Sequence, residues 1–471
     1  MTVAVGHGAG AEPVLERRKP GDPRPVSFTQ RRLWYLDQLT PGTGVYNNPY
    51  VMRISGPLNV EALHKSLNVL VSRHEVLRTV FLAPGGNPVP IVLQKWTVEL
   101  QQFDLRQSQD REVEAEHIVN REAARPFNLA RDLMFRAALI RLQDDEYVFI
   151  HVGHHIATEF GSTETIYREL ALLYEGFCTD NPARLPEPTI QYSDFALWQT
   201  RYLQAERLEK LTAYWKQQLM GAAQLNLPTD KPRPAIPSLR GTRYPVILPV
   251  ELYNASINLS RSARTTPFRG IYAVFNVFLH CYSGQEDISI GSPVSARPRP
   301  GMQGAIGFFV NTLVLRSDLS GNPTFRQLMA RAHAVVEGAI IHADLTLDKL
   351  VEAVRPPREA ARMPLFQVNF RVLKEPAPTL HLKGLTITRP KFVDTGTAKF
   401  DLALELEAAT GKDGFFEYST DLFKESTIAQ MAKDFETILR ALIAQPDIPL
   451  SDVQAVREIR QRVRSLAGLR G

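Results

Sequence analysis

The segment EYVFIHVGHHIATEFGS, residues 146–162, decides which fold this chain is expected to adopt. Its first half, EYVFIHVG (146–153), is a β-rich apolar run of the length typical of a buried strand. This run leads directly into the adjacent histidines His154 and His155. Beyond them, Ser162 is a candidate cap for a helix whose apolar residues recur at helical spacing, namely Ile166, Leu170, Leu173, Tyr174 and Phe177.

The histidines admit three chemical interpretations. A metal site is disfavoured, because in an extended segment His151 and His155 face one side while His154 faces the other, and no H-E-x-x-H motif is present. A general base is the second interpretation, since imidazole titrates near neutral pH and Glu159, four residues on, can orient it. The third is a packed core histidine at a strand end. Spacing alone leaves the last two open.

The length of 471 residues suits two domains of ordinary size. Helical spacing predicts helices after Ser27 and over 59–74, and strand-like runs recur beyond a proline-rich stretch at 225–241. We therefore expect two mixed α/β halves joined by that stretch. The predicted divisions are a flexible lead-in (1–24), a first lobe (25–224), a linker (225–241), a second lobe (242–455) and a basic tail (456–471).

Composition excludes several classes of protein. The chain is 44% hydrophobic and 22% charged, and it has neither an apolar run of about 20 residues nor a secretory signal. Cys178 and Cys281 form no metal-type spacing, so a reducing cytoplasmic setting is expected. Most of the +5 charge comes from five arginines between 457 and 471, which we interpret as a solvated terminal helix or linker. We expect no nucleic-acid or membrane partner.

Nine segments in order resemble the motifs of condensation domains from nonribosomal peptide synthetases, in the chloramphenicol acetyltransferase-like superfamily. The resemblance covers about residues 25–455. The segments are SFTQRRLWYL (27–36), SRHEVLRTVF (72–81), HHIATEF (154–160), YSDFALW (192–198), LPTDKPRP (227–234), GSPVSARP (291–298), IGFFVNTLVLR (306–316), RMPLFQVNF (362–370) and YSTDLF (418–423).

The resemblance implies an α/β fold of two acetyltransferase-like lobes in a V, with a central tunnel. It implies a monomeric acyltransferase in peptide antibiotic biosynthesis that binds no metal or cofactor itself. Donor and acceptor would arrive on the phosphopantetheine arms of carrier proteins, with neighbouring synthetase modules as further partners. His155 falls on the second histidine of the family motif, which acts as a general base or positioning group, and His154 on the first, supporting one.

This sequence departs from the family motif H-H-x-x-x-D-G at two positions. Glu159 replaces the aspartate and Phe160 the glycine. In the family the aspartate is mainly structural and is held by an arginine, for which Arg297 is the candidate here. A glycine allows close approach of the backbone and unusual φ values, so Phe160 is expected to narrow the site, shift the loop or line a donor pocket. Gly161 is expected to let the loop recover its turn.

Other motif residues are assigned more briefly. Asn311 lies near the expected tunnel and is open to either a binding or a structural role, while Ser292 and Ser295 are weaker candidates from the same region. The remaining motif side chains are interpreted as scaffold or core: Arg73, Arg78, Trp34, Tyr192 and Trp198.

Three functions remain open from the sequence. The first is a transferase that joins two carrier-bound substrates through an amide or ester bond. The second is a non-catalytic module that recruits a partner enzyme or carrier protein, which the altered motif permits. The third is a free-standing acyltransferase with a soluble acceptor. Epimerisation and heterocyclisation are disfavoured, because the motifs of those subfamilies are missing.

Overall fold

The computed structural model describes residues 13–179, 181, 183–297, 301–357, 359, 361–373, 378–407 and 414–468. The chain forms two compact units. The first comprises Met1–Arg207, Ser295–Val310 and Ala377–Thr395; the second comprises Leu208–Val294, Asn311–Pro376 and Gly396–Gly471. Each contains helices and a six-stranded sheet, so the predicted α/β class is confirmed. The V-shaped arrangement and its tunnel stay predictions.

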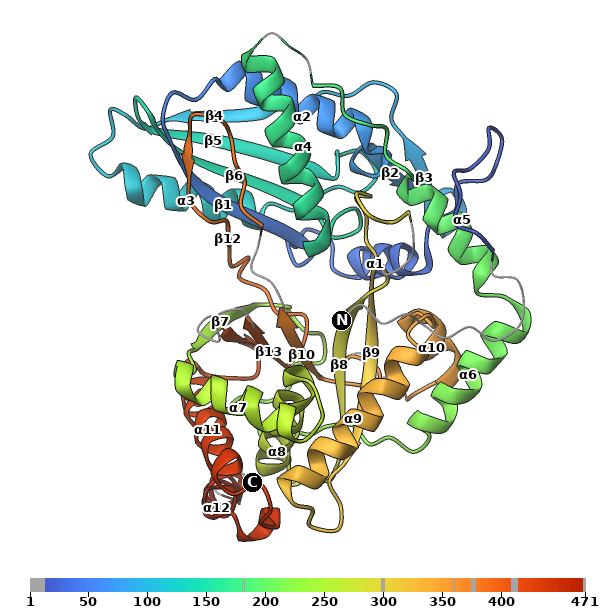
Figure 1. Cartoon of the computed structure of the whole chain (residues 1–471), viewed down its shortest axis with the longest axis vertical. Coiled ribbons are helices and arrows are strands. Elements are labelled where there is room, and N and C mark those ends of the chain that lie inside the picture. Colours follow the sequence, from blue (N-terminus) through green and yellow to red (C-terminus); the bar gives the residue numbers. More distant parts are fainter. Residues whose placement is uncertain are drawn as a thin grey trace. The chain divides into compact units, whose positions relative to one another are not determined.

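The first unit is built on a sheet in the order β11-β1-β6-β5-β4, with β12 also paired to β1 (Figure 1). β6 lies at its centre, antiparallel to both neighbours. The strands are β1 (Asn47–Ser55), β4 (Leu100–Asp104), β5 (Phe135–Gln143), β6 (Glu146–His154), β11 (Thr386–Ile387) and β12 (Lys391–Phe392). A separate ribbon pairs β2 (Thr79–Leu82) with β3 (Val89–Val92).

The helices of the first unit pack against this sheet or against one another. α2 and α4 pack against each other, and α3 contacts β1, β5 and β6. The predicted cap at Ser27 is confirmed, since its hydroxyl accepts the Gln30 backbone N–H at the start of α1. The helices are α1 (Phe28–Leu39), α2 (Val60–Arg73), α3 (Arg111–Ala124), α4 (Phe160–Cys178) and α5 (Tyr192–Tyr202), with short 3-10 turns at Glu75–Arg78 and Pro84–Gly86.

The second unit has the strand order β7-β14-β13-β10-β8-β9. α8 is buried along its length, and its Phe275 and Phe278 stack on Phe370 and Phe416 of the sheet. The strands are β7 (Gly241–Val246), β8 (Asp287–Ser295), β9 (Val310–Asp318), β10 (Val368–Leu373), β13 (Leu402–Glu407) and β14 (Gly414–Ser419). The helices are α7 (Val250–Ser262), α8 (Pro267–Ser283), α9 (Phe325–Ile341), α10 (Leu347–Val354), α11 (Glu425–Ala444), the 3-10 turn Leu450–Asp452 and α12 (Gln454–Gly468), while α6 (Ala205–Leu219) begins at the end of the first unit.

The basic C-terminal segment is a helix, one of the two predicted forms, but the expectation that it is solvated is wrong for one of its faces. Val456, Ile459 and Val463 of α12 are buried, and α12 packs on α8 and α11. Arg462 pairs with the buried Asp434. Apolar residues three and four positions apart give α12 a core-facing stripe in spite of its arginines. Arg470 lies outside the described residues.

Two other segments expected to act as connectors also make specific contacts. Of the predicted lead-in, residues 1–12 lie outside the described part, but Pro13 accepts a hydrogen bond from Trp198 Nε1 and Arg18 pairs with Asp194. The proline-rich stretch 225–241 belongs to the second unit, where Arg233 pairs with Asp401. The division of the chain at 207/208 therefore comes before that stretch.

Candidate functional site

The strand β6 ends at His154, and His155 begins the turn that joins β6 to α4. We call residues 155–159 the histidine turn. His154 is paired with Asn47 across β1, whereas the His155 backbone N–H donates to the Tyr46 carbonyl at 2.8 Å. The extended alternation used to place the three histidines therefore holds only as far as His154.

His151 and His154 are core residues. His151 is 3% exposed, stacks between Tyr50 and Phe135, and its Nε2 lies 2.8 Å from the Tyr167 hydroxyl. His154 is 2% exposed, and its Nδ1 accepts the Ile156 backbone N–H at 3.2 Å. That bond shapes the histidine turn, so His154 supports the turn from within the core.

Burial lowers the pKa of His151 to about 3, which makes the stability of the fold depend on pH. An unfolded histidine has a pKa of about 6.5, so below that pH the unfolded chain binds a proton that the folded chain does not bind. The stabilisation is complete above the unfolded pKa and is lost as the pH falls toward 3. We expect His151→Phe to remove up to about 1.4 kcal/mol per pH unit from the slope of the free energy of unfolding below pH 6. Urea unfolding across this range measures the slope, and an unchanged slope would contradict the assignment.

His155 differs from its neighbours because it is only half-buried. Its Nδ1 lies 2.8 Å from the Thr158 carbonyl oxygen, which can only accept a hydrogen bond. Asn48 Nδ2 also lies 3.2 Å from Nδ1, but it can donate to the Thr158 carbonyl instead, and the shorter contact is the one to that carbonyl. Nδ1 therefore carries the hydrogen, and the neutral ring has its lone pair on Nε2. This is the tautomer that a general base acting through Nε2 requires.

Two side chains distant in sequence also contact His155 or its turn; together with the turn they form what we call the seat of His155. Asn48 of β1 donates from Nδ2 to the Thr158 carbonyl at 3.2 Å. The Phe308 ring lies 4.5 Å from the imidazole, centroid to centroid. Gly153 leaves room for Thr158, since a Cβ there would lie 2.4 Å from Thr158 Oγ1. The imidazole is therefore fixed by its own turn, by β1 and by the segment Ser295–Val310.

Glu159 and Arg297 form the ion pair suggested by the family motif. The Arg297 guanidinium donates to the Glu159 carboxylate, whose side chain is 1% exposed. Arg297 also donates to the Ala305 carbonyl at 2.8 Å and to Ser162 Oγ at 3.1 Å. The pair thus ties the end of the histidine turn to the segment Ser295–Val310.

Glu159, not Ser162, precedes the first turn of α4, which corrects the predicted cap. The helix begins at Phe160, and the Glu159 backbone N–H donates to Ser162 Oγ at 3.4 Å. Ser162 is the third residue of the helix, and its Oγ also bonds both the N–H and the carbonyl of Gly307, at 3.2 Å each. The sequence prediction therefore places the cap three residues too late.

The expected backbone strain at Phe160 is absent. Phe160 is the first helical residue of α4 and does not have a positive φ. Gly161 also has no positive φ; its role is to leave space, because a Cβ there would lie 2.9 Å from Arg297 Nε. The glycine therefore accommodates the arginine that binds Glu159, and it does not restore a turn.

The three candidates from the later motifs have separate roles. Asn311 is 5% exposed and uses its whole amide within the second unit: it donates to the Ala343 and Leu345 carbonyls at 2.8 Å and accepts the Thr312 and Leu347 N–H groups. With all four positions used, Asn311 is structural. Ser292 donates to the Phe370 carbonyl inside the second sheet, and Ser295 accepts the Arg297 N–H at 3.3 Å.

The remaining motif residues are buried or paired, as expected. Arg73 binds Glu169 at 2.9 Å, and Arg78 donates to the Leu93 carbonyl at 2.7 Å. Trp34, Tyr192 and Trp198 are buried. Within the described residues, no group of three or more His, Cys, Asp or Glu side chains is placed to hold a metal ion. No helix in the described part of the chain is both long and apolar enough to cross a membrane.

Sequence reasoning did not single out Asn48, Thr158 or Phe308. Phe308 lay in a recognised motif, IGFFVNTLVLR, but nothing in that motif shows that its ring reaches His155. Asn48 is brought to the site by the β1–β6 pairing, in which it faces Gly153. Such a contact depends on strand register and has no local signal in the sequence.

Comparisons with known proteins agree with this architecture. A family model described as Condensation domain matches residues 22–463. A linear gramicidin synthase from Brevibacillus parabrevis is 41% identical over 429 residues, covering 90% of this chain and 8% of that synthase. Phosphinothricin tripeptide synthetase PhsC from Streptomyces viridochromogenes is 38% identical, covering 93% of this chain and 41% of that synthetase. The chain therefore spans well under two thirds of these relatives.

Solved structures show the same fold. The X-domain in its complex with OxyB from teicoplanin biosynthesis matches with a TM-score of 0.86 and 26% identity, covering 95% of this chain and 99% of that one. The condensation domain of the Monacolin K polyketide synthase MokA matches with a TM-score of 0.78 and 22% identity, covering 90% and 98%. Together with the family match over residues 22–463, these likenesses confirm the resemblance drawn from the nine motifs. The chain belongs to the condensation-domain family of nonribosomal peptide synthetases.

Proposed function

We propose that this chain is a condensation-type acyltransferase in which His155 is the general base. The observation that carries the proposal is the hydrogen bond from His155 Nδ1 to the Thr158 carbonyl, at 2.8 Å. It fixes the tautomer whose Nε2 can accept a proton. Of the three histidines at the end of β6, only His155 is half-buried, while His151 and His154 are buried in the core.

The reaction is attack of an amine, or a hydroxyl, on an acyl thioester. His155 Nε2 accepts the proton that the nucleophile loses as the new amide or ester bond forms at the acyl carbon. The C–S bond then breaks, and the leaving thiolate takes that proton from His155. The family suggests that donor and acceptor are presented on the phosphopantetheine arms of carrier proteins, and that the domain itself contributes only amino-acid side chains. Orientation of two tethered substrates then supplies much of the rate.

The two departures from the family motif support a specialised site rather than a damaged one. Glu159 retains the buried pair with Arg297, and Phe160 starts α4 without backbone strain. Gly161 has no side chain that would collide with the Arg297 guanidinium, which lies beside the longer side chain of Glu159. The local packing is therefore consistent with Glu159 and Phe160 as they stand.

Restoring the family residues is expected to lower the rate. Glu159→Asp withdraws the carboxylate by one methylene from Arg297, and Phe160→Gly places a poor helix former in the first turn of α4. Because a misplacement of about 1 Å in a reacting group can cost about 10²-fold, we expect the smaller shift of the histidine turn in the double variant to lower kcat about tenfold. The measurement is the initial rate of product formation. A gain in rate would show that the natural site is impaired.

A second candidate function is recruitment of a partner enzyme without catalysis. The observation that favours it is the likeness to the X-domain, which was solved in complex with OxyB. In that case His155 would be dispensable, and the relevant property would be a binding surface. The likeness alone does not select this function, since MokA, with the same fold, is described as a condensation domain.

The test of the proposal is product formation by the isolated chain. The donors are aminoacyl thioesters of N-acetylcysteamine, one for each common amino acid, and the acceptor is glycinamide. Dipeptide amide is detected by mass spectrometry and compared with donor hydrolysis in the absence of protein. Enzyme-dependent product supports the proposal. Absence of product from the whole panel would count against it and favour recruitment.

A further inference from the structure

The start of α1 contains a buried glutamine that contacts the histidine turn. Gln30 is 3% exposed, and its Nε2 donates to the Ile156 carbonyl at 3.0 Å. Its Oε1 accepts the Ser27 backbone N–H at 3.2 Å, while its own backbone N–H donates to Ser27 Oγ at 3.0 Å. The hydrogen bond from the Ser27 N–H to Oε1 therefore fixes the orientation of the Gln30 side-chain amide. Since Ile156 directly follows His155, this bond fixes the backbone beside the imidazole.

Tyr192 makes a corresponding contact with Phe308, the second residue beside the imidazole. Its hydroxyl donates to the Phe308 carbonyl at 2.8 Å and lies 2.8 Å from Ser27 Oγ. Phe308 is the residue whose ring lies against His155. Burial raises the pKa of Tyr192 far above its usual value, so the hydroxyl stays a donor at every working pH. Ser27 therefore connects Gln30 and Tyr192.

The Phe308 segment is fitted closely to Tyr192. A Cβ at Gly307 would lie 1.9 Å from the Tyr192 ring, so only glycine permits this approach. Gly307 is in turn bonded through its N–H and its carbonyl to Ser162 Oγ. The backbone that carries the Phe308 ring is consequently held by Tyr192 and by the first turn of α4.

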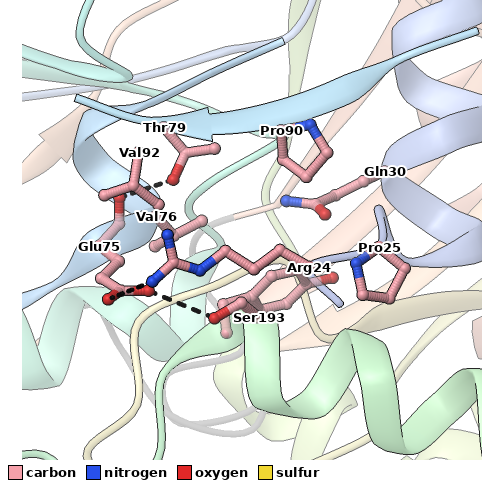
Figure 2. A pocket seen from close by; sticks show the side chains of 10 residues that line it. Arg24, Pro25, Gln30, Glu75, Val76, Thr79, Pro90, Val92 and Ser193 are labelled. Carbon is pink, nitrogen blue, oxygen red and sulfur yellow. Dashed lines mark hydrogen bonds and ion pairs between the residues drawn. The ribbon is translucent and has the colours of Figure 1, made fainter. Parts of the chain in front are cut away.

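Gln30 and Tyr192 also lie on the wall of a pocket, shown in Figure 2. Other polar residues around it are Arg24, Glu75, Thr79 and Ser193. Arg24 pairs with Glu75 at 3.6 Å, and Ser193 Oγ donates to Glu75 at 3.3 Å. Arg24 thus lines the same pocket but pairs with Glu75 rather than with the histidine turn or Phe308, which makes it a matched control.

We propose that Gln30 and Tyr192 are positioning residues for His155, acting through Ile156 and Phe308 respectively. Gln30 holds the turn that carries the imidazole, and Tyr192 holds the backbone of the residue whose ring packs against it. Both act through backbone carbonyls and neither touches the reacting atoms. The consequence for rate rests on the proposed function, but the effect on the geometry of His155 does not.

The test measures the imidazole and the rate separately. Protein labelled with 15N-histidine reports the tautomer of His155 through its ring nitrogen shifts, and the signal is assigned by its loss in His155→Asn. In Gln30→Met and Tyr192→Phe we expect a reduced population of the Nδ1-H tautomer, with Arg24→Ala unchanged. With the donor best used in the thioester assay, kcat should fall about tenfold and KM should stay constant, as is typical when an orienting partner is lost.

A substitution that alters charge gives a readout that loss of packing cannot imitate. In Gln30→Glu the introduced carboxyl can donate to the Ile156 carbonyl only when protonated, and burial raises its pKa. We expect Gln30→Glu to give the same His155 spectrum as the natural protein at about pH 5 and a different one at about pH 8. Gln38→Glu, at an exposed site on the same helix, should show no such dependence.

The outcomes separate the two proposals. A His155 spectrum that is identical in Gln30→Met, Tyr192→Phe and the natural protein would overturn the positioning role, whatever the rates are. An altered spectrum in these variants, with Arg24→Ala unchanged, supports it. Unchanged product formation in His155→Ala would count against the proposed function alone, because the spectrum does not depend on turnover.

Discussion

Arg297→Ala is expected to destabilise the protein by about 3–5 kcal/mol, which is typical when one partner of a buried ion pair is removed. The substitution leaves the Glu159 carboxylate, 1% exposed, without its guanidinium. The Ala305 carbonyl and Ser162 Oγ also lose a donor. Urea unfolding with far-UV circular dichroism measures the change. Activity should fall as well, because the pair fixes the end of the histidine turn.

Two comparisons distinguish this cause from loss of side-chain packing. Adding Glu159→Gln to Arg297→Ala removes the unpaired buried negative charge, so the double variant should recover a large part of the lost free energy of unfolding. Arg106→Ala breaks an exposed ion pair with Asp144 in the same unit and should cost at most about 1 kcal/mol. Equal effects of Arg297→Ala and Arg106→Ala would contradict the account of Glu159 as a buried, charged group.

His155→Ala is expected to lower the rate of condensation by about 10²–10⁴-fold, the range typical of a general base. The fold should survive, because His155 is half-buried and its backbone N–H bond to Tyr46 is kept. The residual rate would come from orientation of the two substrates. Initial rates and unfolding curves measured together test this. A large loss of stability with the loss of rate would mean that His155 is structural.

Much of the scaffold was predictable because its signals are local. Ser27, the helix over 59–74 and the strand leading to His154 all follow from capping residues and from apolar periodicity. The pair Glu159–Arg297 was suggested by the family motif alone, since 138 positions separate its members. The helical spacing of Val456, Ile459 and Val463 indicates that one face of α12 is buried. The prediction of a solvated segment followed instead from the arginines between them.

The seat of His155 was not predictable from local patterns. Asn48 reaches it through strand register, Phe308 through a segment of the second half of the sequence, and Gln30 through the cap of α1. Each of these contacts spans more than 100 positions. The functions of Gly161 and Gly307 were equally hidden, because each leaves space for a side chain distant in sequence and neither adopts a special φ.

The central claim is that His155 acts as the base of a condensation reaction, and a single-turnover rate tests it most directly. The donor is the aminoacyl thioester that the natural protein uses best, with glycinamide as acceptor, and dipeptide amide is followed by mass spectrometry. His117→Ala, at an exposed histidine on α3, is the matched control. The account predicts a rate about 10²–10⁴-fold lower in His155→Ala and unchanged in His117→Ala. Equal rates in all three proteins would contradict it.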